Sequence, residues 1–185
     1  MTALSLPPWA VVSEERKAHI ERVADLLRRW ADALGVDNGE KDRWLKAAYL
    51  HDALRDADPE LLEELAPEAW GVPALRHGPA AAVMAERDGE DDRSVLDAVR
   101  YHSVGYTGWD RVGRMLYLAD YLDPGRPFAK EERRALAERV PQDPDGVLEE
   151  VVKERLVWTI QAGRPLIKET VELWNALVEG RSRRS

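Results

Sequence analysis

The chain has 185 residues, of which 44% are hydrophobic and 34% are charged, a composition typical of one globular domain with a buried core. It contains no cysteine, which excludes disulfides, thiolate metal sites and a cysteine nucleophile. A net charge of -8 disfavours extended nucleic-acid binding, so an anionic substrate would have to be captured locally by metal ions or a few arginines.

The two ends of the chain form short segments outside the predicted single domain, which spans residues 13–180. Residues 1–12 lack a basic start and a long apolar centre, and no later run approaches the roughly 18 apolar residues of a membrane span. We therefore expect a cytoplasmic protein with no membrane partner. Residues 181–185 form a short basic tail, which we interpret as solvated.

The first predicted helix begins after Ser13 and ends at Gly35. Ser13 is a favourable N-cap, and Gly35 is a typical helix stop. His19 lies one turn ahead of an apolar stripe made of Val23, Leu26, Leu27, Trp30 and Leu34. His19 is therefore expected to point into the core.

After a turn at residues 37–39, an apolar helical run at 44–55 ends in adjacent His51 and Asp52. Trp44, Ala48 and His51 share one face at helical spacing, so His51 points where core side chains point. An imidazole and a carboxylate near a helix end can aim two ligands at one cation.

The middle of the chain predicts a short helix from Asp58-Pro59 to about Ala66 and a loop rich in proline and glycine. His77 lies where this loop meets the next helix. A helix over residues 92–102 then carries His102 on the same side as Val95, Ala98 and Val99.

The following helix, over residues 109–122, presents four apolar side chains inward, and Asp120 falls on the same stripe. Two or three further helices follow, with breaks at 141–146 and 163–165. No period-2 segment occurs, so the sequence predicts an all-α fold, a compact helical bundle. Four tryptophans at helical spacing are interpreted as core residues: Trp30, Trp44, Trp158 and Trp174. The charged run 130–134 is interpreted as a solvated helix face.

All four histidines thus occupy inward-facing or junction positions on different segments, together with Asp52 and Asp120. A carboxylate among apolar side chains is costly unless it is paired or binds a cation. For Asp120 the alternative to a metal is a buried ion pair with Arg100, Arg111 or Arg114. Six such ligands exceed what one tetrahedral ion needs, and they suit two ions that share a carboxylate and a bridging water.

The order His, His-Asp, His, His, Asp resembles the HD-domain metal-dependent phosphohydrolases. The words around these residues are similar to the YqeK-type branch, the symmetrical dinucleoside tetraphosphatases: His51-Asp52-Ala53-Leu54-Arg55, His77-Gly78-Pro79, Tyr101-His102-Ser103-Val104-Gly105 and Ala119-Asp120-Tyr121-Leu122-Asp123-Pro124-Gly125-Arg126. The similarity extends from about His19 to Asn175, which is nearly the whole chain.

This resemblance implies an HD-domain bundle with two metal ions. One ion would be held by His19, His51, Asp52 and Asp120, and Asp52 would bridge to a second ion held by His77 and His102. Iron is the metal that the family suggests; manganese or cobalt also suits nitrogen and oxygen ligands.

The chain departs from the family's pattern at four places. Residues 20–22 replace a small residue and a glycine after the first ligand, and Arg55 replaces a lysine. Val104 replaces a hydroxyl residue, and Lys168 stands where a histidine is common.

The implied chemistry is the hydrolysis of diadenosine tetraphosphate at an inner phosphorus to give two ADP. Two cations lower the pKa of a bridging water from about 15.7 toward 7 and neutralise phosphate charge. We expect the catalytic residues to be Asp52, Arg55 and Arg126, with both arginines clamping phosphate. Further substrate contacts are hydroxyl donors, stacking aromatics and residues of the family's motifs: Ser103, Thr107, Tyr106, Trp109, Tyr121, Thr170 and Asn175.

Two other functions stay open at this point. One is a phosphohydrolase of the same superfamily that acts on mononucleotides or nucleoside triphosphates. The other is a non-enzymatic helical interaction or regulatory module, in which the histidines are structural or bind one stabilising metal. The expected partner is a small-molecule nucleotide substrate. The oligomeric state stays open, with a homodimer as one alternative.

Overall fold

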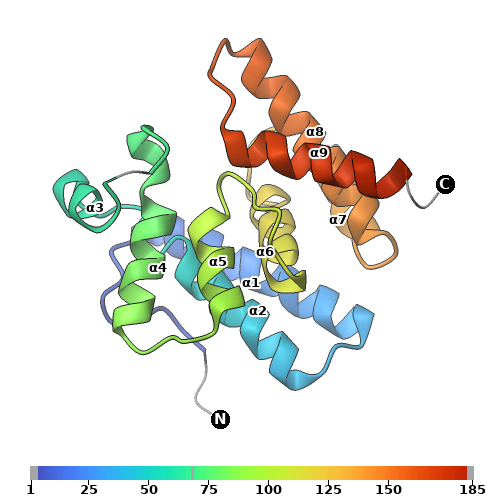
Figure 1. The fold of residues 1–185 in the computed structure, drawn as a ribbon. Helices are drawn as coiled ribbons and strands as arrows, with labels where there is room; N and C mark the ends of the chain where they lie inside the picture. The colour runs from blue at the N-terminus through green and yellow to red at the C-terminus, as the bar shows by residue number, and fades with distance from the viewer. Residues whose placement is uncertain (1–3, 68, 183–185) are drawn as a thin grey trace.

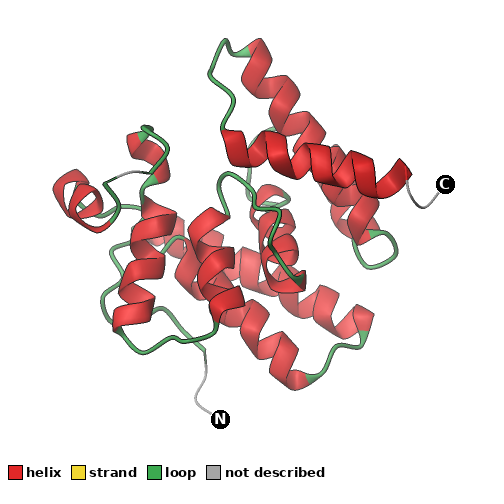
Figure 2. Ribbon diagram, in the orientation of Figure 1, coloured by secondary structure: helices red, strands yellow, loops and turns green. Residues whose placement is uncertain are grey.

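The computed structural model describes residues 4–67 and 69–182, with side chains up to residue 180. Residues 1–3 of the predicted N-terminal segment and 183–185 of the predicted basic tail lie outside the described residues. The described part contains helices and loops and no strand, as Figure 2 shows, which confirms the all-α prediction. The α-helices in chain order are α1 Glu14–Leu34, α2 Asn38–His51, α3 Pro59–Leu65, α4 His77–Arg87, α5 Arg93–Tyr101, α6 Arg111–Tyr121, α7 Lys130–Arg139, α8 Pro144–Gln161 and α9 Lys168–Ser182.

Short polar side chains start most of the helices. The Ser13 hydroxyl accepts a hydrogen bond from the Arg16 amide, and Gly35 ends α1 in the left-handed region at φ 63°. The expected turn at 37–39 is replaced by an N-cap: the Asp37 carboxylate accepts from the Glu40 amide. The helix therefore begins earlier than hydrophobic periodicity indicated.

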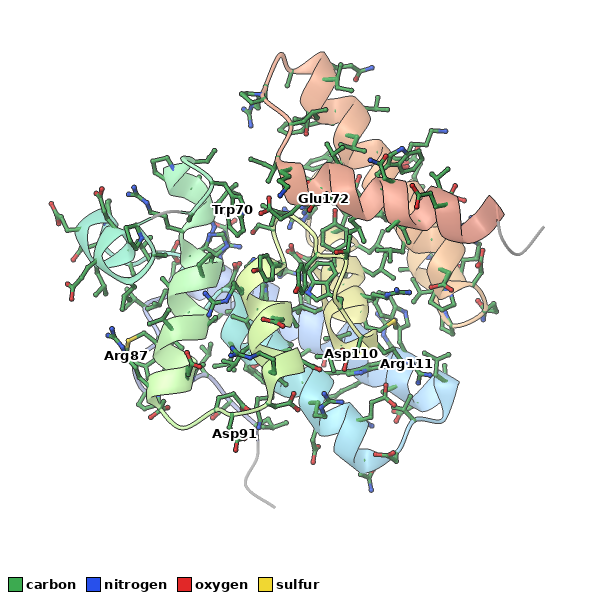
Figure 3. The ribbon with its side chains drawn as sticks, in the orientation of Figure 1. Trp70, Arg87, Asp91, Asp110, Arg111 and Glu172 are labelled. Carbon is green, nitrogen blue, oxygen red and sulfur yellow. The ribbon has the colours of Figure 1, made fainter. Side chains whose placement is uncertain are left out.

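Helices α1, α2, α4, α5 and α6 pack against one another around the core, and α8 and α9 form a hairpin on one side (Figure 1). Trp44, Tyr117 and Leu116 are among the fully buried side chains. Charged side chains such as Arg87, Asp91 and Arg111 lie on the outside (Figure 3). No helix in the described ranges is long and apolar enough to cross a bilayer.

The tryptophans divide into buried and exposed rings. Trp30 and Trp44 lie in the core, as predicted, and Trp174 is half-buried. The prediction for Trp158 is wrong: 57% of this residue is exposed, because the C-terminal half of α8 extends beyond the bundle. The charged run 130–134 is also not uniformly solvated, since Arg133 is only 6% exposed.

Replacing Asp92 with alanine is expected to lower the free energy of unfolding by about 1–2 kcal/mol and the Tm by about 2–6 °C. The Asp92 carboxylate accepts from the Ser94 amide at 3.0 Å and so caps α5, and it also accepts two hydrogen bonds from Arg43, at 2.5 and 3.1 Å. The Arg43 hydrogen bond lowers the pKa of Asp92. The contribution is therefore present at neutral pH and is lost as the pH falls through that lowered pKa. Thermal unfolding measures the effect, with exposed Asp91→Ala as the control; equal Tm values for the two variants would contradict it.

Candidate metal centre and cavity

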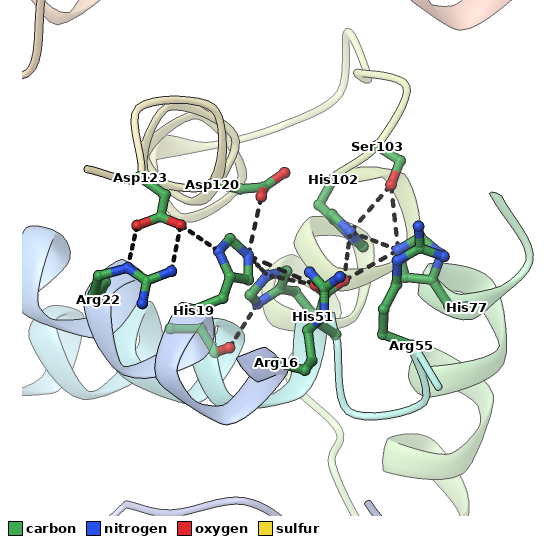
Figure 4. Close-up of polar contacts among 12 residues, drawn as sticks. Arg16, His19, Arg22, His51, Arg55, His77, His102, Ser103, Asp120 and Asp123 are labelled. Carbon is green, nitrogen blue, oxygen red and sulfur yellow. Dashed lines mark hydrogen bonds and ion pairs between the residues drawn. The ribbon is translucent and has the colours of Figure 1, made fainter. Parts of the chain in front are cut away.

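Six buried side chains from five helices and the residues that cap them converge at one place in the bundle. His19 comes from the second turn of α1, His51 and Asp52 from the end of α2, and His77 begins α4. His102 caps the end of α5, and Asp120 lies in the last turn of α6. All six are at most 6% exposed, and Figure 4 shows the four histidines and Asp120 in one row of polar contacts.

Asp52 lies at the centre of this cluster, and its two oxygens face opposite halves. Oδ1 lies 3.1 Å from His77 Nε2 and 3.5 Å from His102 Nε2. Oδ2 lies 3.6 Å from His19 Nε2 and 3.7 Å from His51 Nε2. One carboxylate therefore contacts all four imidazoles, which is the arrangement that a bridging ligand needs.

The hydrogen bonds of three histidines fix which ring nitrogen faces the centre. Each Nδ1 lies close to the backbone carbonyl three residues earlier: His51 to Ala48 at 2.7 Å, His77 to Ala74 at 2.9 Å and His102 to Val99 at 2.8 Å. A carbonyl only accepts, so each Nδ1 carries the proton. In the neutral ring the Nε2 lone pair then points into the cluster.

These lone pairs face other acceptors. Burial lowers the pKa of His51 to about 4 and also lowers the pKa of His77, so both rings are neutral at pH 7. The Nε2 atoms of His77 and His102 lie 3.1 Å apart. The Ser103 hydroxyl lies 3.4 Å from the first and 3.1 Å from the second, but its single proton can serve only one of them. Converging acceptors repel one another unless a cation lies between them, so the residues fit metal ions. The ligand atoms form two overlapping groups, each within 4.8 Å: His19, His51 and Asp120, and His51, Asp52 and His102.

His19 is oriented from behind by a carboxylate. Its Nδ1 lies 2.8 Å from Asp123 Oδ2, and Arg22 donates two hydrogen bonds to the same carboxylate, at 2.6 and 3.0 Å. Burial acts to lower the pKa of His19, but the hydrogen bonds to Asp120 and Asp123 outweigh it and raise this pKa to about 9.

Two glycines of the sequence motifs leave room for these residues. A Cβ at Gly125 would collide with the end of the Arg22 side chain, so a larger residue here would displace the guanidinium that binds Asp123. A Cβ at Gly78 would lie 2.9 Å from the Val99 carbonyl and 3.0 Å from His102 Cε1. The glycine after His77 thus lets α4 approach His102.

Arginines surround the cluster. Arg16 Nη1 lies 2.7 Å from Asp52 Oδ2, and Arg126 Nη2 lies 2.8 Å from Asp120 Oδ1. Burial acts to raise the pKa of Asp120, but the His19 hydrogen bond and the Arg126 charge lower it well below its ordinary value. The expected alternative partners of Asp120, the arginines at 100, 111 and 114, are wrong, because Arg126 takes that place and Arg155 follows at 3.9 Å.

A cavity of about 860 Å³ adjoins the cluster, within the usual size range of ligand pockets. Ser103 joins the two, since its Oγ lies 3.1 Å from His102 Nε2 and the residue also lines the cavity. The cavity lies between the bundle and the α8–α9 hairpin. Its lining residues come from the segment before α4, the loop after α5, the end of α6 and the chain that follows it, and α7, α8 and α9.

The expected substrate contacts divide into three groups. Four of them line the cavity: Ser103, Tyr121, Arg126 and Thr170. Arg55 lies near the other end of the cluster, where its charge adds to the effect of burial in lowering the pKa of His77 (Figure 4). The remaining four do not line the cavity: Tyr106, Thr107, Trp109 and Asn175.

Two of these aromatic residues have protein partners instead. Trp109 is 5% exposed, and its indole N–H donates to the Asp97 carbonyl at 3.1 Å, so it is a core residue and is not free to stack on a base. Tyr106 stacks on Tyr101 with ring centroids 4.4 Å apart. Sequence periodicity did not identify the residues that line the cavity in their place, which are Phe128, Arg133, Arg155, Trp158 and Arg164.

The fold and the site together define an all-helical protein with a buried histidine and aspartate cluster suited to metal ions. The model for the HD domain family matches residues 16–125, more than half of the chain. The chain belongs to the HD domain family, which confirms the resemblance seen in the sequence.

Comparison with individual proteins gives descriptions more specific than the family. The chain is 29% identical to the symmetrical bis(5'-nucleosyl)-tetraphosphatase of Bacillus subtilis over 91% of this chain and 92% of the relative. It is 26% identical to the Staphylococcus aureus protein of the same description, over 88% and 86% of the two chains. The structure also resembles a Clostridium acetobutylicum protein described as a "predicted HD superfamily hydrolase involved in NAD metabolism", with a TM-score of 0.79, 25% identity and 91% of each chain covered.

Proposed function

We propose that this protein is a metal-dependent symmetrical bis(5'-nucleosyl)-tetraphosphatase, which converts diadenosine tetraphosphate and water into two ADP. The observation that carries the proposal is the Asp52-centred cluster of six ligands, which opens onto a cavity lined by arginines. The descriptions of the relatives agree with this chemistry.

Asp52 would hold two metal ions, with His19, His51 and Asp120 on its Oδ2 side and His77 and His102 on its Oδ1 side. We favour iron because the resemblance to the HD-domain phosphohydrolases implies it. Manganese or cobalt is an alternative, since the donors are imidazole nitrogens and carboxylate oxygens. When bound, such ions supply positive charge for the phosphate oxygens and lower the pKa of a water molecule between them.

The remaining residues would position the substrate. Arg126 donates to both the carbonyl and the carboxylate of Asp120 and also lines the cavity, so one guanidinium can hold a ligand residue and reach a phosphate. The Ser103 hydroxyl can donate a hydrogen bond to phosphate. In the reaction the water oxygen bonds to an inner phosphorus, and the bond between this phosphorus and the central bridging oxygen breaks. The bridging oxygen leaves with the second ADP.

Aromatic rings for the nucleobases would come from Phe128 and Trp158. Both line the cavity and each is 57% exposed. Guanidinium groups lie over both rings, Arg133 over Phe128 and Arg164 over Trp158, and the exposed part of each ring would contact a base. They replace Tyr106 and Trp109 in this role, because those two residues are stacked or buried against the protein.

Product analysis tests the proposed function. The metal-loaded protein is incubated with diadenosine tetraphosphate, dATP or dAMP, and the products are separated by chromatography. We expect ADP as the sole product of the dinucleotide, with slower turnover of the other two. AMP plus ATP from the dinucleotide, or faster hydrolysis of dATP or dAMP, would favour a different HD phosphohydrolase. An absence of both bound metal and hydrolysis would favour a non-enzymatic module.

Replacing Arg126 with alanine is expected to lower kcat/KM for diadenosine tetraphosphate about tenfold or more, while metal content stays the same. A charge-assisted hydrogen bond contributes about 1.5–3 kcal/mol, and about 1.4 kcal/mol corresponds to tenfold. Steady-state kinetics with elemental analysis measures both quantities. Arg134→Ala is the control, because Arg134 is exposed and pairs only with Glu138 on its own helix. An unchanged kcat/KM would remove Arg126 from the substrate site.

A cytoplasmic location, a homodimer and the absence of nucleic-acid binding stay predictions. We also propose that residues 13–180 form one functional unit, because residues of both the bundle and the α8–α9 hairpin line the cavity.

A further inference from the structure

Arg133 on α7 is a buried charge that forms no ion pair within the described part of the chain. The residue is 6% exposed, and its Nε and Nη1 atoms have no hydrogen-bond partner there. A buried guanidinium is costly unless an anion or several acceptors satisfy it. The Glu154 carboxylate acts on Arg133 through its charge without pairing with it, so the position favours a bound anion.

Two aromatic rings hold the Arg133 guanidinium in place. Its Cζ lies 4.3 Å from the ring centroid of Tyr121 and 4.6 Å from that of Phe128. The nearby Glu154 accepts a hydrogen bond from the Tyr121 hydroxyl at 2.8 Å rather than pairing with Arg133. Stacking fixes the plane of the guanidinium and leaves its N–H groups free for a ligand.

The cavity that Arg133 lines is strongly positive. Among the residues that the structure describes, four arginines line it: Arg126, Arg133, Arg155 and Arg164. No carboxylate in the described residues lines it, although the chain has a net charge of -8. Like charges this close repel one another, and binding of an anion relieves the repulsion. The chemistry favours an extended ligand with several negative charges.

Arg133 differs from Arg126 and Arg155 in having no contact with the metal-ligand cluster in the described part of the chain. Arg126 and Arg155 each reach Asp120, at 2.8 and 3.9 Å, and Arg155 also donates to the Ser103 carbonyl at 2.6 Å. In the described part of the chain Arg133 forms no such contact, and its guanidinium lies against the rings of Tyr121 and Phe128. A phosphate chain that starts at the cluster would therefore meet Arg126 and Arg155 first and Arg133 next.

We propose that Arg133, stacked between Tyr121 and Phe128, is an anion subsite that binds a phosphate group away from the metal-ligand cluster and so selects chains of several phosphates over single phosphates. This proposal rests on the proposed function for the identity of the chain, a dinucleoside polyphosphate. An inorganic polyphosphate has the same phosphate chemistry.

The test is calorimetric binding to the metal-loaded full chain with three probes. These are orthophosphate, inorganic tripolyphosphate and a diadenosine tetraphosphate analogue with a methylene group in place of the central bridging oxygen. Arg133→Gln is expected to weaken tripolyphosphate and the analogue at least tenfold and orthophosphate less than twofold. Arg134→Gln is the matched control on the same helix, with an exposed side chain, and is expected to match the unmodified protein.

Several results would overturn the subsite. Affinities within twofold of the unmodified protein would do so, as would an equal loss for orthophosphate, because Arg133 would then act on the cluster itself. A loss for the dinucleotide analogue alone would assign Arg133 to the nucleoside instead. Should Arg133→Gln not fold, Arg133→Lys carries the test. It is expected to bind tripolyphosphate at least threefold more weakly than Arg134→Lys, because one ammonium cannot replace a planar fork, and equal affinities would overturn the subsite.

Binding and hydrolysis separate this proposal from the proposed function. Tripolyphosphate binding that depends on Arg133, without ADP formation from diadenosine tetraphosphate, would keep the subsite and contradict the function. ADP formation with an unchanged KM and unchanged probe affinities in Arg133→Gln would keep the function and overturn the subsite.

Discussion

Replacing Asp52 with asparagine is expected to remove metal from both halves of the cluster and to slow diadenosine tetraphosphate hydrolysis roughly 1,000-fold or more. Among the residues that the structure describes, Asp52 is the one side chain whose two oxygens each face a different pair of histidines. The amide loses the negative charge that offsets two cations. Its NH2 group would also donate to histidine nitrogens, which satisfies them without a metal ion.

Elemental analysis and product formation, measured on the same preparation, test this expectation. Asp58→Asn is the matched control, because Asp58 is exposed and its side chain makes no cap hydrogen bond to α3. The control is expected to keep full metal content and full activity. An Asp52→Asn protein that retains activity, or that retains its full complement of metal, would contradict a bridging role.

Replacing His77 with alanine is expected to remove one metal ion and to leave the other. His77 contacts Asp52 only through Oδ1, at 3.1 Å, whereas His19, His51 and Asp120 lie on the other side. We expect metal content to fall from two ions per chain to one and hydrolysis to fall roughly 100-fold or more, because a two-metal reaction needs both charges.

Comparing His77→Ala with Asp52→Asn shows whether the two metal ions can be removed separately. Titration of metal-free protein with Mn²⁺ should show one binding event in His77→Ala, two in the unmodified protein and none in Asp52→Asn. Loss of both binding events in His77→Ala would mean that the halves cannot be occupied separately. Retention of both would place His77 outside the ligand set.

The sequence was sufficient to predict the helices and the convergence of the six side chains. Caps are local, so Ser13 and Gly35 bound α1, and Asp58-Pro59 begins α3. The positions of the histidines followed from helical periodicity and from the break before His77. The all-α fold and the membership of the HD domain family were both confirmed.

The cavity could not be predicted, because its walls depend on how α7, α8 and α9 fold back over the bundle. A charged run on a helix reads as solvated from local pattern alone, yet Arg133 is buried by Tyr121 and Phe128 from outside its own helix. Trp158 shows the opposite error: its apolar neighbours indicated a core position, and the end of α8 leaves the ring exposed. Both residues needed tertiary structure, which periodicity does not contain.

The most direct test of two ions around one carboxylate is an anomalous diffraction experiment on crystals of the metal-loaded protein, recorded on both sides of the absorption edge of the bound metal. Two anomalous peaks are expected, one adjacent to each oxygen of Asp52. A single peak, or peaks at a distance from the six side chains, would contradict the two-metal centre from which the proposed reaction follows.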